Sequence, residues 1–525
     1  MLVAALTAVL LVAVGGSTAA SSLPAPHTLR VEYLYEPLGI EVSRSPRFSW
    51  RLAGRAGDRN VSQASAELEI CRVGFEFGSS SPCHIVQVGP SASVNVEAPG
   101  LVLLEDTLYT WRVRWRAEAG GEPSAFSPNA TFGTELRAGW AGSDFIGGDY
   151  TSNQLRTEFK LASDSSAVGR AVLYIVGLGS NRVSLSGAAV GSIFRSPPTQ
   201  FAERLLYDVH DVTRILREGG VGASHALAVS LGHARYASQT SPSPGRCTGG
   251  QTTCDMVTRL VLSIVFADGT RQRVVSASGK GGRWLVTGGP TTLDDSYAGE
   301  VFDARLATPG WDLPSFKPTL CAGGTGGRGC YREAEAVAVP PAAVLSSYVM
   351  PPVSQVELYT AIRFWQPQHD EFSFDFGQNV AGVLTLQIPE GCPSGTRIKV
   401  THGEAVHQPQ RENGGPGRVF HLYDCAPDGN GCTGFMTYIC SGSESAHDGT
   451  NMWTPRFFTS GGQFVKIEGF PGPLAREAVR LSGVRVDAEH TGMVMTSNDR
   501  LNEVSRIARG SFLGNLAFGF PSDCP

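Results

Sequence analysis

The sequence predicts a mainly β protein, made of tandem β-sandwich and jelly-roll modules that are followed by one strong helix. Apolar and polar residues alternate with a period of two in many short segments, most clearly in YTWRVRW, residues 109–115. The chain is rich in turn formers, with 63 Gly and 32 Pro among its 525 residues. A long helical apolar period occurs only from Ser497 onward. This length and pattern favour three or four domains, most of them all-β.

Composition and charge narrow the classes of partner. Apolar residues make up 42% of the chain, enough for several cores, and charged residues only 17%. The formal net charge of −5 gives no electrostatic reason to expect nucleic acid or an anionic membrane surface as a partner. We therefore expect a neutral substrate, as a sugar would be.

Residues 1–20 are interpreted as a signal peptide. An apolar run from Leu2 to Val14 is followed by Gly-Gly and four small residues, with cleavage expected near Ala19 or Ala20. The run is too short to cross a bilayer, and no later segment approaches the length of a membrane span. An ordinary buried strand or helix is the alternative. The interpretation predicts a secreted protein.

The cysteines favour an oxidising compartment. Four pairs are close neighbours in turn-rich segments and are expected to form disulfides: Cys71–Cys83, Cys247–Cys254, Cys321–Cys330 and Cys425–Cys432. Cys392 and Cys440 are a further candidate pair, which leaves Cys524 as the odd cysteine. A zinc site is disfavoured, because Cys-x-x-Cys spacings and companion histidines are missing from these segments.

Residues 28–135 form the first expected module. Segments 47–52, 66–73 and 108–115 alternate apolar with polar residues, and no helical pattern separates them. This predicts a fibronectin-III-like or immunoglobulin-like β-sandwich of about 100 residues. We expect this module to carry no ligand.

Residues 139–335 form the second expected module, a jelly roll. Segments 171–176 and 182–185 are joined by a Gly-rich turn that predicts a hairpin, and residues 211–217 are the one short helical turn. Further strands are expected at 226–232, 258–266 and 272–277.

A carboxylate-rich stretch, TTLDDSYAGEVFDAR, lies inside the second module at residues 291–305. It places four carboxylates within ten residues: Asp294, Asp295, Glu300 and Asp303. Oxygen ligands at this density suit Ca²⁺ or the hydroxyl groups of a sugar. The spacing does not match an EF-hand, and we favour the structural interpretation, a polar loop that braces the next strand, over a ligand site.

Residues 344–487 form the third expected module, a β-sandwich around the segment FSFDFGQNVAGVLTLQI, residues 372–388. Asp375 and Glu404 are an attractive acid–base pair for a hydrolase. We favour the other interpretation, in which Asp375, Gln378 and Asn379 brace a corner of the sheet. The same letters do not indicate a kinase, since the other kinase motifs are missing. His402 is one of the polar residues that could be nominated for chemistry, and the histidines expected to be isolated in β context are His233, His407 and His421.

The last element is an amphipathic helix. Its apolar residues recur at three- and four-residue intervals: Leu501, Val504, Ala508 and Phe512. Ser497 or Asn498 is placed to cap its first amides. Such a stripe is stable only when it is buried against a partner, so we expect further elements beyond Pro525.

Several of these segments resemble the α-L-rhamnosidases whose catalytic domain is an (α/α)6 barrel. The similar segments are the opening at residues 30–50, TTLDDSYAGEVFDAR, FSFDFGQNVAG and the final NLAFGFPSDCP at residues 515–525. The resemblance implies a carbohydrate-binding-like jelly roll, a concanavalin-like third module, and the truncated start of the barrel at residues 489–525. It also implies that Asp523 binds hydroxyls of the rhamnose ring.

The resemblance implies terminal α-L-rhamnose of a glycan or glycoside as the substrate, hydrolysed with inversion and without a required cofactor. Inversion needs two carboxyl groups about 6.5–9.5 Å apart. The general acid and base of the family have no counterpart before Pro525, so we expect the chain alone to be inactive. Two alternatives remain: a secreted carbohydrate-binding protein built of the same modules, and a scaffold with no affinity for sugar.

Overall fold

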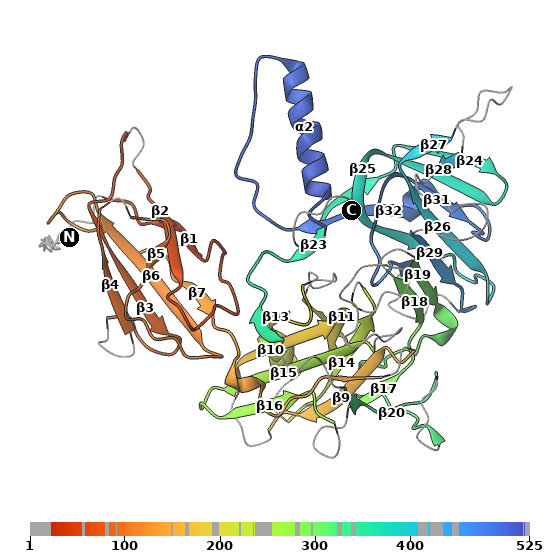
Figure 1. Cartoon of the computed structure of the whole chain (residues 1–525), viewed down its shortest axis with the longest axis horizontal. Coiled ribbons are helices and arrows are strands. Elements are labelled where there is room, and N and C mark those ends of the chain that lie inside the picture. The colour runs from red at the N-terminus through yellow and green to blue at the C-terminus, as the bar shows by residue number, and fades with distance from the viewer. Residues whose placement is uncertain are drawn as a thin grey trace, which may run out of the picture. The chain divides into compact units, whose positions relative to one another are not determined.

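The structure is a computed structural model in which two compact units are separate, residues 1–135 and residues 136–525. It describes the following residues: 23–54, 58–78, 83–90, 92–148, 151–162, 167–191, 199–219, 222–234, 236, 255–278, 284–295, 298–322, 328–337, 343–407, 418–420, 434–443, 451–517 and 519. Figure 1 shows that both units are built mainly from strands.

The first unit is a β-sandwich of two antiparallel sheets. One sheet has the order β1-β2-β5 and the other β4-β3-β6-β7. The strands are β1 (His27–Val31), β2 (Arg47–Arg51), β3 (Ser65–Arg72), β4 (Cys83–Val88), β5 (Val96–Glu97), β6 (Leu108–Arg116) and β7 (Ala130–Gly133). Phe48 of β2 contacts Trp111 of β6 across the sandwich, with ring centroids 4.9 Å apart. Buried and partly exposed residues alternate along all of β6, as the sequence predicts for a strand with one buried face.

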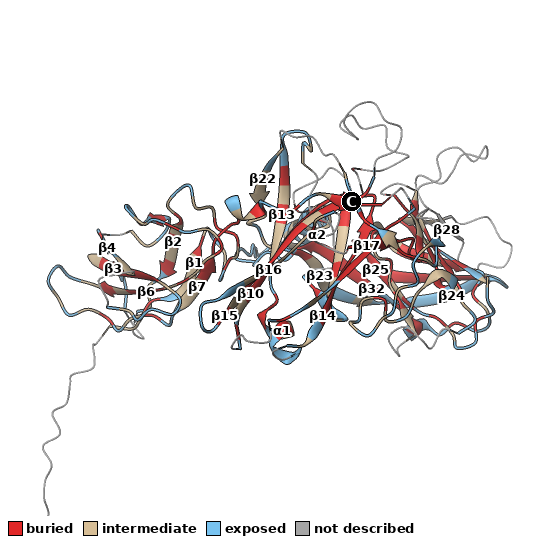
Figure 2. Cartoon of the chain, turned by 90° about the horizontal axis from the view of Figure 1, so that it is seen from below, coloured by how far each residue is buried: buried red, intermediate tan, exposed pale blue. Residues whose placement is uncertain are grey.

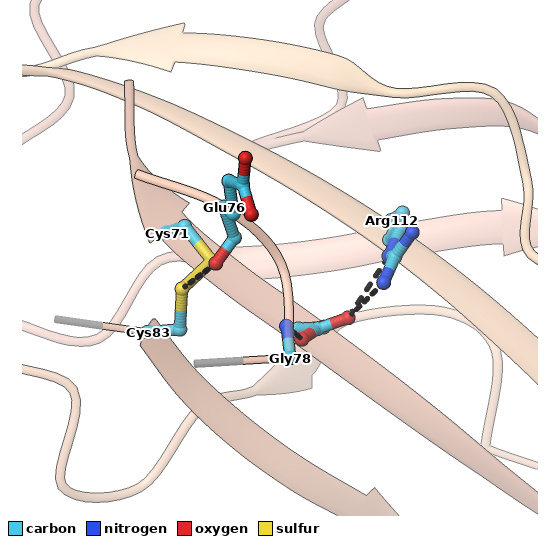
Figure 3. Close-up of a disulfide and its surroundings, with 6 residues drawn as sticks. Cys71, Glu76, Gly78, Cys83 and Arg112 are labelled. Carbon is cyan, nitrogen blue, oxygen red and sulfur yellow. Dashed lines mark hydrogen bonds and ion pairs between the residues drawn. A yellow bond between two sulfur atoms is a disulfide. The ribbon is translucent and has the colours of Figure 1, made fainter. Parts of the chain in front are cut away.

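A disulfide between Cys71 and Cys83 joins β3 to β4 next to a buried carboxylate (Figure 3). The side chain of Glu69 on β3 accepts a hydrogen bond from Arg112 Nε at 2.9 Å and another from the backbone N–H of Gly78. The disulfide thus ties β3 to β4, and Glu69 holds Gly78 and Arg112 by charge-assisted hydrogen bonds.

Two facing sheets form the first part of the second unit. One has the order β21-β8-β15-β10-β13-β22, with β16 also on β15, and the other β12-β11-β14-β9-β17-β20. The first contains β8 (Ile146–Gly147), β10 (Val168–Leu178), β13 (Arg204–Asp211), β15 (Val257–Phe266), β16 (Arg271–Val275), β21 (Glu335–Ala336) and β22 (Val344–Ser347). The second contains β9 (Gln154–Lys160), β11 (Ser180–Leu185), β12 (Ala188–Val190), β14 (Ser224–Gly232), β17 (Leu285–Thr287) and β20 (Arg332–Glu333). Figure 2 shows their buried residues in red, and one apolar cluster includes residues of both sheets.

The short helix α1 (Thr213–Gly219) follows β13, close to the helical turn expected at 211–217. Asp211 Oδ1 accepts a hydrogen bond from the backbone N–H of Thr213 at 2.8 Å. Leu216 is fully buried in the apolar cluster, so packing holds a helix that is too short to be stable alone.

The third sheet has the order β18-β19-β29-β26-β31-β25-β32-β23, with β24 and β30 also paired to β25. Its strands are β18 (Thr291–Asp295), β19 (Gly299–Asp303), β23 (Val353–Thr360), β24 (Arg363–Gln368), β25 (Glu371–Gln387), β26 (Arg397–Gly403), β29 (Phe435–Ile439), β30 (Met452–Trp453), β31 (Ser460–Glu468) and β32 (Val479–Val486). A small hairpin, β27 (Ala405–His407) and β28 (Arg418–Phe420), lies outside this sheet. The segment that dominates the sequence pattern, FSFDFGQNVAGVLTLQ, is the long central strand β25.

Strand pairing crosses the boundary expected between the second and third modules. β18 and β19 precede that boundary in sequence, yet β19 pairs in parallel with β29 of the third sheet, with Glu300 opposite Met436. β22 follows the boundary and pairs in parallel with β13 of the jelly-roll sheet. The two expected modules therefore exchange strands, which places the carboxylate-rich hairpin on the third sheet.

Two further disulfides lie in the second unit, Cys321–Cys330 and Cys392–Cys440. Both pairs were expected from the sequence. The pairs Cys247–Cys254 and Cys425–Cys432 lie outside the described residues, as do the signal-peptide segment 1–20 and Asp523.

The helix near the C-terminus is α2 (Asp499–Gly514), coloured dark blue in Figure 1. Asn498 caps it, since Asn498 Oδ1 accepts hydrogen bonds from the backbone N–H groups of Arg500 and Leu501 at 3.0 and 3.3 Å. The apolar stripe is exposed in the described residues, with Val504 at 61% and Phe512 at 56%. Within the described part of the chain, no helix is long and apolar enough to cross a membrane.

Candidate functional site

The β18–β19 hairpin, the carboxylate-rich stretch of the sequence analysis, carries a buried polar cluster. Asp294 stands opposite Glu300, and Asp295 opposite Gly299. Gly299 has a φ of +100°, and a Cβ on it would lie 1.9 Å from the backbone oxygen of Phe435. Only glycine therefore allows β19 to approach β29 this closely.

Asp294 forms a buried pair with His233. Its Oδ2 accepts a hydrogen bond from the His233 backbone N–H at 2.5 Å, and its Oδ1 lies 2.7 Å from His233 Nδ1. Asp294 is 2% exposed and His233 is 4% exposed. The preceding residue, Gly232, leaves room for this pair, because a Cβ there would lie 2.8 Å from Asp294 Oδ2 and 2.6 Å from the Phe457 ring. The sequence interpretation of His233 as isolated is therefore wrong.

Glu300 holds the backbone that precedes β31. Its Oε1 accepts a hydrogen bond from the Arg456 N–H at 2.8 Å, and its Oε2 accepts one from the Phe457 N–H at 2.7 Å. The carboxyl group is fully buried. Burial raises the pKa of Glu300 to about 7, with the backbone hydrogen bonds acting in the opposite direction and Asp294 adding to the rise.

Two arginines complete the cluster, Arg182 on β11 and Arg456 in the segment before β31. Burial lowers the pKa of Arg182 to about 10; repulsion from Arg456 adds to this, and attraction to Glu300 opposes it. Burial also lowers the pKa of Arg456, against the attraction of Glu300 and Asp312. The Arg456 guanidinium lies over the ring of Phe302 at 5.2 Å. The cluster thus brings together charged groups from the jelly-roll sheet that contains β11 and from the third sheet, which contains β18, β19 and β31.

The other two carboxylates of the stretch have local partners. Asp295 Oδ1 accepts a hydrogen bond from the Ala298 N–H at 3.0 Å. Asp303 is paired with Arg305, with Nε at 2.9 Å from Oδ1 and Nη2 at 2.7 Å from Oδ2. This ion pair lowers the pKa of Asp303. Asp303 therefore belongs to the structural bracing that the sequence offers as the alternative.

Two carboxylates of the hairpin have protein partners. The Asp294 and Glu300 oxygens accept hydrogen bonds from protein donors, and among the described residues no group of three or more His, Cys, Asp or Glu side chains is arranged to hold a metal ion. Calcium binding remains an untested prediction, and we assign no chemistry to a metal here.

Glu300 is also unsuited to acid–base catalysis. A general acid or base must reach the reacting atom of the substrate, and both Glu300 oxygens are buried and bonded to backbone N–H groups. The hydrogen bonds of Glu300 instead fix the segment before β31 to the β18–β19 hairpin. A pKa near neutrality marks a functional site only when the group is accessible, which Glu300 is not.

Asp375, the other sequence candidate for acid–base chemistry, is likewise engaged. It is 1% exposed and accepts hydrogen bonds from the Gly377 N–H at 2.8 Å, Gln463 Nε2 at 2.9 Å and Arg363 Nη2 at 2.9 Å. Burial would raise its pKa, but these hydrogen bonds and the Arg363 charge lower it overall. Asp375 thus braces the bend of β25, where register with β31 shifts between residues 375 and 380.

Glu404 and its neighbours stay at the surface. Glu404 Oε1 accepts a hydrogen bond from Asn379 Nδ2 at 3.2 Å, and Gln378 Nε2 donates to the Tyr359 hydroxyl at 3.1 Å. His402 is fully buried on β26. His407 ends β27, and His421 lies outside the described residues.

Sequence reasoning missed three members of the buried cluster: Arg182, His233 and Arg456. They are separated from Glu300 and Asp294 by long stretches of sequence, and Glu300 and Arg456 are 156 residues apart. No local spacing motif connects such positions. The density of carboxylates between residues 294 and 303 predicts that hydrogen-bond donors lie nearby, but it does not identify the residues that supply them.

Three consecutive stretches of the chain match family models. Residues 26–138 match the N-terminal immunoglobulin domain of Rha78A-like proteins, residues 166–357 the α-L-rhamnosidase N-terminal domain, and residues 366–486 the bacterial α-L-rhamnosidase concanavalin-like domain. Over these stretches the chain is similar to the N-terminal and concanavalin-like domains of α-L-rhamnosidases.

Curated relatives named α-L-rhamnosidase match over long stretches. One from Formosa agariphila is 24% identical over 519 residues, covering 93% of this chain and 50% of the relative. One from Streptomyces avermitilis is 28% identical over 386 residues, covering 71% of this chain and 32% of the relative. One from Alteromonas sp. strain LOR is 24% identical over 531 residues, covering 95% and 51%. The chain spans about half the length, or less, of these relatives.

Solved structures share the fold. The α-L-rhamnosidase of Dictyoglumus thermophilum has a TM-score of 0.77 at 24% identity, covering 96% of this chain and 54% of that one. The Streptomyces avermitilis enzyme, solved in complex with L-rhamnose, has a TM-score of 0.77 at 19% identity, with 95% and 61% covered. The Aspergillus terreus enzyme has a TM-score of 0.76 at 23% identity, with 95% and 53% covered.

Proposed function

We propose that this chain is the non-catalytic, β-rich portion of a secreted α-L-rhamnosidase. The whole protein would hydrolyse terminal, non-reducing α-L-rhamnose from a glycan or glycoside with inversion of configuration. The observation that carries the proposal is the order of the three matched domains along the chain, 26–138, 166–357 and 366–486. Secretion is supported by the apolar segment 2–14 and by the disulfides of the described residues.

The engaged carboxylates support inactivity of the chain by itself. Inversion needs one carboxyl group as acid and a second as base, about 6.5–9.5 Å apart with a water between them. Asp294, Glu300 and Asp375 are buried and bonded to protein donors. None of them is available to a glycosidic oxygen. The acid and base of the proposed enzyme would lie beyond Pro525.

The proposal is tested with an aryl α-L-rhamnoside. The 525-residue polypeptide is expected to release no aglycone. The native protein, captured from culture medium by an antibody raised against this polypeptide, is expected to release it and to yield the inverted anomer of rhamnose by NMR. Hydrolysis by the polypeptide alone would refute the assignment of its carboxylates, and an inactive native protein would refute the enzyme.

A carbohydrate-binding protein built of the same modules is the second candidate. The observation that favours it is the same commitment of buried carboxylates to structure, because a binding protein needs no acid–base pair. Binding of L-rhamnose by a native protein that hydrolyses no rhamnoside would support this candidate over the enzyme.

A further inference from the structure

A polar recess of about 320 Å³ opens at one end of the β1-β2-β5 sheet of the first unit. Its walls come from the turn after β1, the segment before β2, the first residue of β2 and the last residue of β5. The lining residues are Glu32, Arg44, Ser45, Arg47 and Glu97. This volume lies at the lower end of the range for ligand pockets and suits a single sugar ring.

The charges of the recess balance, with two carboxylates facing two guanidinium groups. Arg47 binds Glu32 through its backbone N–H at 2.8 Å and through Nε at 3.0 Å. Burial alone would raise the pKa of Glu32, but the hydrogen bonds from Arg47 lower it overall. A site with this balance does not select an anion or a cation, and a neutral ligand with many hydroxyl groups meets both its donors and its acceptors.

Two lining groups remain accessible to a ligand. Arg44 is exposed, its charge acts on Glu32, and among the described residues it forms a surface ion pair with Glu41 at 3.0 Å, which contributes little and is easily exchanged. Glu97 is exposed, and within the described residues its carboxylate has no hydrogen bond or ion pair. A guanidinium and a carboxylate in one recess can donate to and accept from neighbouring hydroxyls of the same ring.

Tyr33, which follows the lining residue Glu32, is 50% exposed, and Tyr35 of the same segment is 55% exposed. The Arg47 guanidinium lies over the Tyr33 ring at 5.1 Å from its centroid, and the Arg30 guanidinium over the Tyr35 ring at 4.6 Å. Each ring is thereby held in place on one side. Aromatic rings that are rigid and half exposed supply contact area at low conformational cost, as in other binding surfaces.

The turn that presents Tyr33 is conformationally unfavourable. Glu32 and Tyr33 have φ values of 50° and 68°, and Val31 and Leu34 exchange backbone hydrogen bonds across them at 3.0 Å. Such turns favour Asn-Gly, so Glu-Tyr at these positions costs free energy. Arg47 donates a hydrogen bond to Glu32 and its guanidinium lies over the Tyr33 ring, and these two contacts stabilise the turn. Strain of this kind is common where a side chain serves in binding.

We infer that the first unit binds a neutral sugar residue, with the ring in the recess lined by Arg44 and Glu97 and its apolar face against Tyr33. The sequence offered no reason to expect a ligand on this module. The inference does not depend on the proposed hydrolysis, because a sugar site on the first unit suits both the enzyme and the binding protein.

The test is titration of the full chain with L-rhamnose, D-galactose and D-glucose, followed by saturation-transfer NMR. We expect at least one sugar to bind, and Tyr33→Ala and Glu97→Gln each to weaken binding about five- to tenfold, since an aromatic contact or a charged hydrogen bond contributes on this scale. Circular dichroism checks that the variants fold, and Glu97→Gln changes an exposed side chain without altering the turn.

Phe75→Ala is the matched control. Phe75 is also an exposed aromatic of the first unit, 46% exposed, with the Arg72 guanidinium at 4.9 Å from its ring centroid. Arg72 does not line the recess, whereas Arg47, the partner of Tyr33, does. The Phe75→Ala variant should bind sugar as the wild type does. The inference is overturned if no sugar of the panel binds, or if Tyr33→Ala and Glu97→Gln bind as tightly as the Phe75→Ala control.

Discussion

Replacement of Glu300 by glutamine should change how the stability of the second unit depends on pH. Glu300 is fully buried, and its pKa of about 7 in the folded chain stands above the ordinary value of 4.5. Between these two values the folded state binds a proton that the unfolded state has released. Stability therefore falls as pH rises through this window, and levels off above pH 7.

The size of the effect follows from the shift. One pKa unit corresponds to about 1.4 kcal/mol, so the shift of Glu300 corresponds to a loss of about 3 kcal/mol of unfolding free energy between pH 4.5 and pH 7. Glu300→Gln keeps an oxygen that can accept from the Arg456 and Phe457 N–H groups, and it does not ionise. The variant should lack this loss, whatever constant offset the amide group introduces.

Urea unfolding at a series of pH values, followed by tryptophan fluorescence and circular dichroism, measures the difference between wild type and Glu300→Gln. The unfolding free energy of the variant, relative to that of the wild type, should rise by about 3 kcal/mol as pH rises from 4.5 to about 7. Parallel profiles for the two proteins would refute the raised pKa. Glu300→Ala serves as the comparison, because it removes the acceptor altogether and should destabilise at every pH by roughly 2–5 kcal/mol.

Three further changes test other parts of the structure. Gly299→Ala should destabilise the second unit by at least 3 kcal/mol, because its Cβ would meet a backbone oxygen at 1.9 Å; Gly269→Ala, also at positive φ but with open space around it, should cost only about 1–2 kcal/mol in the same urea titration. Removing the Cys392–Cys440 disulfide by a double alanine substitution, which opens a loop with a sequence separation of 48, should lower the unfolding free energy by about 4 kcal/mol. Asn498→Ala should raise amide exchange at the start of α2 by about fivefold, through loss of about 1 kcal/mol of capping.

Each of these predictions can fail independently. Equal costs for the two glycine variants would mean that β19 and β29 are not as close as described. An unchanged unfolding midpoint without Cys392–Cys440 would mean that the unfolded chain is not constrained by that bond. Unaltered exchange in Asn498→Ala would mean that another residue caps the helix.

Local patterns in the sequence predict much of the fold. The alternation in LYTWRVRWR is the buried and exposed pattern of β6, and Asn498 is the cap of α2 that the spacing indicated. The pairs Cys71–Cys83 and Cys321–Cys330 are close in sequence and therefore easy to match. In each case the physical cause acts over a few residues.

Long-range pairing was not predictable from such patterns. Nothing in the alternation of residues 299–303 distinguishes a jelly-roll strand from a strand that joins β29 in a different sheet. For the same reason, the sequence could not predict the donors that bind Glu300 or the partner of Asp294. His233, that partner, is 61 residues from Asp294. The density of carboxylates indicated a polar site, but only the fold shows that N–H groups of the protein itself bind these carboxylates.

The central claim, that this chain is the β-rich portion of a larger α-L-rhamnosidase, is tested most directly by the intact mass of the native secreted protein. An antibody raised against the polypeptide captures that protein, and its mass is measured after removal of glycans. The account predicts a product far larger than 55.7 kDa. A product of this mass, or slightly less after loss of residues 1–20, would contradict the account and leave the carbohydrate-binding protein as the better assignment.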